Sequence, residues 1–138
     1  MTAHDHSPNG SHNSIKDYNR STDRYEVIRI SLFSALRNES ISQRYVARIR
    51  AQLIAPIAVE VRAALGLSAT ANPAARALDE QLVLSLHATI IYGIMRKHVF
   101  HAAPPHDPEF LIELYVDGFM RYADEAFRRI DAHCEGRT

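Results

Sequence analysis

The segment LVLSLHATIIYGIM, residues 82–95, decides the fold of this chain. Ten of its fourteen side chains are apolar, and on a helical wheel they cover roughly 240° of the circumference, whereas a surface helix needs a stripe of only about 100°. Three of the four exceptions, Ser85, Thr89 and Gly93, recur every four residues and form one narrow strip. The pattern predicts a long helix that is covered on more than one side, with small residues where a second backbone approaches.

Helical spacing continues on both sides of this segment. Apolar residues at positions 25, 28, 32, 33 and 36 predict a first helix, and the pattern from 41 to 65 predicts a second one that ends at Gly66. Pro56 removes a backbone donor inside the second helix, so we expect a kink or two consecutive helices. The pairs Asn72-Pro73 and Asp107-Pro108 predict the starts of a third helix, to about residue 100, and a fourth, to about residue 130.

The predicted fold class is all-α, an antiparallel bundle of four to five helices, because no segment alternates with the period of a strand. Residues 1–23 carry almost no large apolar side chains, and we expect them to form a disordered polar tail. Residues 24–132 are the predicted helical domain, and residues 133–138 a frayed tail. A chain of 138 residues is long enough for one core and too short for two ordinary domains.

Composition argues against several classes of protein. Sixteen basic and sixteen acidic residues balance, so the net charge offers no attraction to nucleic acid or to an anionic membrane. The sequence has no long apolar span, no signal-peptide pattern and a single cysteine, Cys134. These features predict a cytoplasmic location. Without a nucleophile elbow or a Gly-rich phosphate loop, we expect neither an enzyme nor a cofactor. His98, His101 and His106 fit a helix end and a solvated turn, so we expect no metal.

Three stretches carry a family resemblance: RISLFSALRNESISQRYVARIRAQLIAPIAVEVRAALGL, LDEQLVLSLHATIIYGIMRKHVF and HDPEFLIELYVDGFMRYA. In order and spacing they resemble the C-terminal regulatory half of TetR-type transcriptional repressors. The resemblance implies an all-helical domain whose last two long helices form the four-helix bundle of a homodimer, and whose interior often holds an inducer pocket. Residues 1–24 offer no helix-turn-helix of the kind that opens those proteins, so we expect a module that does not bind DNA by itself.

Two groups of residues are candidates for function. His87 lies at the centre of the apolar arc, and an apolar ligand pocket is expected beneath the Pro56 kink. The candidate ligand-binding residues are Phe33, Tyr45, Arg48, His87, Tyr92 and Met95, for each of which ordinary core packing is the alternative. The candidate dimer interface comprises Ser85, Thr89, Gly93, Arg96, Tyr115, Gly118 and Tyr122, with plain solvation at the helix end as the alternative for Arg96.

The predicted function is a TetR-like effector-binding and dimerisation module of a transcriptional regulator. It would pair with a second copy or with a full-length TetR-type relative and would bind a small hydrophobic ligand. Neither nucleic acid nor a membrane is an expected partner. The alternative is a purely structural helical homodimer that binds no small molecule.

Overall fold

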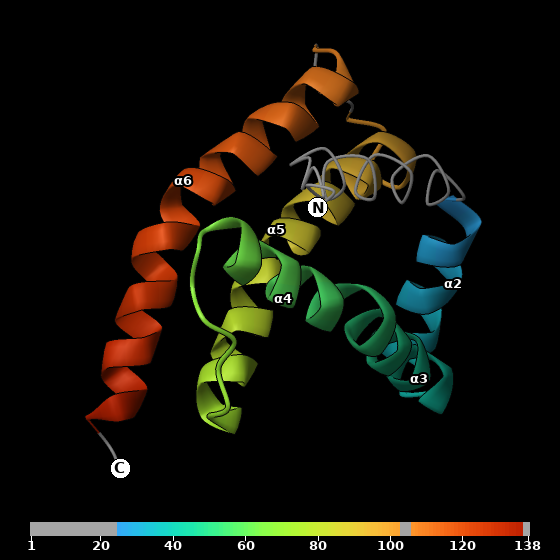
Figure 1. Ribbon diagram of the computed structural model, residues 1–138. Coiled ribbons are helices and arrows are strands. Elements are labelled where there is room, and N and C mark those ends of the chain that lie inside the picture. Colours follow the sequence, from blue (N-terminus) through green and yellow to red (C-terminus); the bar gives the residue numbers. More distant parts are fainter. Residues whose placement is uncertain (1–24, 103–105, 137–138) are drawn as a thin grey trace, which may run out of the picture.

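The computed structural model describes residues 25–102 and 106–136, and all the regular structure in those two ranges is helical (Figure 1). The elements are α2 (Tyr25–Leu36), α3 (Ser40–Ile49), the π-helical turn η1 (Arg50–Ile54), α4 (Ala55–Ala64), α5 (Pro73–His98) and α6 (Pro108–Glu135). The all-α prediction is therefore confirmed for the described residues. The expected polar tail, residues 1–23, lies outside them.

The helix ends follow from capping chemistry. Asn72 accepts hydrogen bonds from the backbone N–H groups of Ala74 and Ala75 at the start of α5, and Asp107 accepts one from Glu109 at the start of α6. Gly66, with a φ of 69°, ends α4, because glycine adopts this left-handed conformation without a Cβ penalty. The N–H of Leu67 then donates to the carbonyl of Arg62 at 2.9 Å, which completes a Schellman motif.

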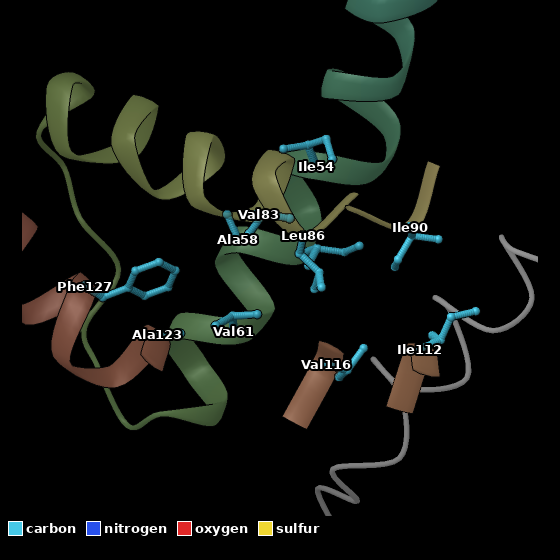
Figure 2. Close-up of a cluster of buried hydrophobic side chains, with 11 residues drawn as sticks. Ile54, Ala58, Val61, Val83, Leu86, Ile90, Ile112, Val116, Ala123 and Phe127 are labelled. Atoms are coloured by element: carbon cyan, nitrogen blue, oxygen red, sulfur yellow. The ribbon is translucent and has the colours of Figure 1, made fainter. Parts of the chain in front are cut away.

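The core lies where α4 meets the helical hairpin of α5 and α6. These two long helices run in opposite directions and diverge from their connection, and α4 crosses the space between them (Figure 1). Figure 2 shows their buried side chains gathered in one cluster. Its members are Ile54, Ile57, Ala58, Val61, Val83, Leu86, Ile90, Ile112, Val116, Ala123 and Phe127. The first half of the domain, α2 and α3, packs mainly on itself and extends away from this cluster.

Two expectations need correction. Helix α6 does not stop near residue 130 but continues to Glu135, because Cys134 extends its apolar stripe and is buried beside the loop that precedes α5. The frayed tail predicted for 133–138 is thus helical through Glu135, and only residues 137 and 138 lie outside the description. In α2, Phe33 and Leu36 do not join a buried face and are 60% and 83% exposed, since among the described elements α2 packs mainly against α3 and less against α5.

Candidate functional site

A groove between the α3–η1 segment and α5 is the main concave site near His87. Its volume is about 340 Å³, which is within the range of small-molecule sites. Tyr45 and Ile49 reach it from α3, Arg50 and Ile54 from η1, and His87 from α5. The remaining lining residues are Val46, Ala77, Glu80, Gln81 and Leu84. The groove therefore has largely apolar walls and a few polar groups.

The π-helical turn brings these side chains to the groove. Helices α3 and α4 and the η1 turn between them form one continuous helical segment. The inner, least exposed face of its first half consists of residues 42, 45, 49 and 53, and that of its second half consists of residues 54, 57, 58 and 61. At the α-helical 100° per residue these two faces would lie roughly 120° apart. The Ala55 N–H instead donates to the carbonyl of Arg50, five residues back, so the turn holds one extra residue and cancels about 100° of the difference. The turn therefore brings Ile49 and Leu53 into line with the core-facing residues of α4.

An ion pair spans the groove. Arg50 Nε donates to Glu80 Oε2 at 2.5 Å, which links η1 to α5. The two side chains differ in environment, because that of Arg50 is 65% exposed and that of Glu80 is only 11% exposed. The negative charge is therefore fixed in the wall of the groove, whereas the positive charge lies at its rim.

His87 lies between the groove and the core. On the core side it lines a small cavity of about 20 Å³ together with apolar residues that include Leu53, Ile57 and Leu86. Burial among them lowers the pKa of His87 below its ordinary value of 6.5, because desolvation disfavours the charged imidazolium. The imidazole is consequently neutral at pH 7.

The structure brings together two of the six residues predicted for ligand binding, Tyr45 and His87. Arg48 is exposed and donates to Gln52 at 3.0 Å, one turn along its own segment. Phe33 and Tyr92 are exposed and Met95 is half-buried, and none of the three lines this groove. Sequence reasoning missed Arg50 and Glu80. The heptad spacing of Glu80 and His87, which places both on one side of α5, was the available signal.

The residues predicted for a dimer interface lie on the outer side of the α5–α6 hairpin. Ser85 and Thr89 are exposed, and their hydroxyls donate to the carbonyls of Leu82 and Ser85 in their own helix. Tyr92, Tyr115 and Tyr122 are 57%, 41% and 57% exposed. Arg96 is half-buried in the last turn of α5. We call Leu78, Ser85, Thr89, Tyr92, Gly93, Tyr115, Gly118 and Tyr122 the hairpin face.

Both glycines of the hairpin face lie beside open space. A Cβ atom added at Gly93 or at Gly118 would meet no packed neighbour within 4 Å among the described residues. A second groove, of about 310 Å³, joins the two helices on this side between Leu78 and Leu82 of α5 and Tyr122 of α6. The hairpin face therefore includes residues of both α5 and α6, and this groove joins the two helices at Leu78 and Tyr122.

A buried charged cluster lies at the other end of α4. Arg62 is 4% exposed and binds two carboxylates in bidentate fashion, Asp79 of α5 and Asp131 of α6, with the shortest contacts at 2.5 and 2.6 Å. It also donates to the carbonyl of Ser68 and lies 5.4 Å from the ring centroid of Phe127. Hydrogen bonds to Asp131 and Asp79 raise the pKa of Arg62 despite its burial, so it remains charged. The cluster joins three helices.

Comparisons of the chain with protein-family models, with characterised proteins and with solved structures find no match. The similarity to TetR-type regulators therefore stays a prediction from the sequence pattern. No helix in the described part of the chain is long and apolar enough to cross a membrane. Within residues 25–102 and 106–136, no three or more His, Cys, Asp or Glu side chains are grouped as a metal site would require.

Proposed function

We propose that the described helices form a dimerisation and effector-binding module of a TetR-like transcriptional regulator that acts in the cytoplasm and performs no catalysis. The observation that carries this proposal is the exposed hairpin face. There, exposed tyrosines and two glycines beside open space lie on the two longest helices. The groove beside His87 supports the effector-binding part. Any contact with an operator would be made by polypeptide other than residues 25–136, such as a full-length relative.

Glycine within a helix supports association at the hairpin face. An interior helical glycine costs roughly 0.5–1 kcal/mol relative to alanine. Among the described residues, neither Gly93 nor Gly118 packs against a neighbouring element that would offset this cost. Because these two positions have no side chain, the backbone of a second helix could approach them closely. The hydroxyls of Ser85 and Thr89 already donate to carbonyls of their own helix, so their burial there would leave no unsatisfied donor.

The occupant that fits the hairpin face is a second copy of this chain. Tyr115 and Tyr122 are seven residues apart on one side of α6, with Gly118 near the midpoint. An antiparallel crossing of two α6 helices near Gly118 would place Tyr115 of one copy opposite Tyr122 of the other. That reciprocal pairing is what a two-fold symmetric interface requires, and exposed tyrosines suit such a contact.

Sedimentation equilibrium of the full chain tests the proposal, with Gly93→Leu as the disruptive variant. We expect the unmodified chain to have the mass of a dimer and the variant to have the mass of a monomer, since the new side chain would separate the two copies. Ala63→Leu also introduces a leucine at an exposed helical position, on α4 and outside the hairpin face, and should remain dimeric. A monomeric unmodified chain, or a dimeric Gly93→Leu variant, would contradict the proposed interface.

A further inference from the structure

Glu80 places a single negative charge in the wall of an otherwise mainly apolar groove. It is the only carboxylate among the residues that line the groove, and the whole residue is 9% exposed. Among the described residues its one hydrogen-bond partner is Arg50, which occupies Oε2. Since a carboxylate has about four acceptor positions, Oε1 remains available to a group that enters the groove.

The present partner of Glu80 can leave at small cost. The Arg50 side chain is 65% exposed, so its guanidinium can rotate into water and remain solvated. The Glu80 carboxylate cannot move into water with Arg50, because Glu80 is a buried residue of α5 in the wall of the groove. The neutral His87 imidazole adds no positive charge at the inner end of the groove. When Arg50 rotates outward, the groove presents one fixed, poorly hydrated negative charge.

We propose that this groove binds a hydrophobic monocation, with the protonated nitrogen of an alkyl or arylalkyl amine on Glu80 and its apolar body against Ile49, Ile54 and Leu84. The cation replaces the Arg50 guanidinium on the carboxylate. An anionic ligand fits poorly, because its only cationic partner would be Arg50 at the solvated rim, with the Glu80 charge close by. This inference rests on the effector-binding part of the proposed function and names the ligand class of that site.

Calorimetric titration of the full chain at pH 7 with three matched probes, all below their micellar concentrations, tests the inference. The probes are n-octylammonium, n-octanol and n-octanoate, which share one alkyl chain and differ in head-group charge. We expect octylammonium to bind about tenfold more tightly than octanol, because a charge-assisted hydrogen bond to a poorly solvated carboxylate is worth that much. Octanoate should bind more weakly than octanol.

Two substitutions should act in opposite directions. Glu80→Gln removes the negative charge and should abolish the preference for octylammonium over octanol. Arg50→Met keeps an apolar stem but removes the competing guanidinium, so it should tighten octylammonium binding several-fold and leave octanol binding unchanged. Glu60→Gln, an exposed acid on α4 outside the groove, is the matched control and should behave as the unmodified chain does.

The inference would be overturned if the three probes bound equally, if octanoate bound most tightly, or if no probe bound. Weaker binding of octylammonium to the Arg50→Met variant would also overturn it. The mass of the same samples, measured by sedimentation, separates it from the proposed function. A dimer that binds octylammonium no more tightly than octanol would refute the ligand class and leave the dimerisation role intact. A monomer that prefers octylammonium through Glu80 would support the ligand class and refute the dimer.

Discussion

Arg62 shows how one charged residue connects three helices. Its guanidinium binds Asp79 on α5 and Asp131 on α6, and the Schellman motif at the end of α4 fixes the backbone from which it extends. Burying Arg62 and Asp79 costs free energy that burying well-packed apolar residues would not. Their value lies in geometry, because a planar guanidinium with two bidentate partners sets how α4 meets both long helices.

We expect Arg62→Met to lower the free energy of unfolding by about 3–5 kcal/mol, because it leaves the buried Asp79 carboxylate and the partly exposed Asp131 carboxylate without their cation. Asp79→Asn should cost less, since Arg62 then keeps Asp131 as its partner. Urea unfolding followed by circular dichroism measures both. The control is Asp124→Asn, whose i,i+4 pair with Arg128 is exposed, so the change should stay within about 0.5 kcal/mol. An Arg62→Met variant as stable as this control would contradict a structural role for the cluster.

The sequence carried a signal for this cluster that periodicity alone could have revealed. Asp79 lies four residues after Ala75 and four before Val83, so it falls within the buried stripe of α5. Asp131 likewise follows the fully buried Phe127 by four residues. An acid within an apolar stripe implies a buried cation. The wheel could not identify Arg62 as that cation, because the partners are 17 and 69 residues apart along the chain.

At the scale of elements, the η1 turn decides which residues form the groove. The interruption was predicted at Pro56, which lacks the N–H that would continue the helical ladder. What the sequence pattern did not predict is the extra residue within the turn. The apolar positions of α3 and α4 follow different phases, and the extra residue brings Ile49 and Leu53 into line with the core-facing residues of α4.

Deletion of Ala51, an exposed residue of η1, tests this account. The shortened turn would be α-helical and would rotate α3 by about 100°, which withdraws Tyr45 and Ile49 from α5. We expect the free energy of unfolding to fall by about 2–4 kcal/mol, because those half-buried side chains become exposed. Pro56→Ala keeps the residue count and should retain the fold and the groove. A deletion variant that unfolds at the same urea concentration as the unmodified chain would rule out the proposed role of the turn.

The described helices leave many large apolar side chains exposed. Thirteen large hydrophobic side chains among the described residues are at least 40% exposed, from Leu78 at 40% to Leu36 at 83%. Some belong to α2 and α3, and others to the hairpin of α5 and α6. Where such side chains lie next to one another, as an exposed apolar patch, they mark an association surface.

If the folded chain is a dimer, its melting temperature should rise with protein concentration, since mass action favours the folded dimer over unfolded monomers. Gly118→Leu should abolish this concentration dependence. At high dilution the same variant should melt no lower than the unmodified chain, because leucine is the better helix former and its Cβ meets no neighbour within the subunit. Differential scanning fluorimetry over a wide concentration range measures both effects. A melting temperature independent of concentration would argue against self-association.

The sequence by itself determined the helices, their capping residues and the position of the interruption, because these depend on local spacing and on the chemistry of neighbouring residues. It also indicated that His87 and Tyr45 lie near one another, since both fall on inward faces of neighbouring helices. Only the tertiary structure decided that Arg50 and Glu80 share the groove, that Arg62 joins three helices, and that α6 continues to Glu135. Those features depend on contacts between distant segments, which helical periodicity does not encode.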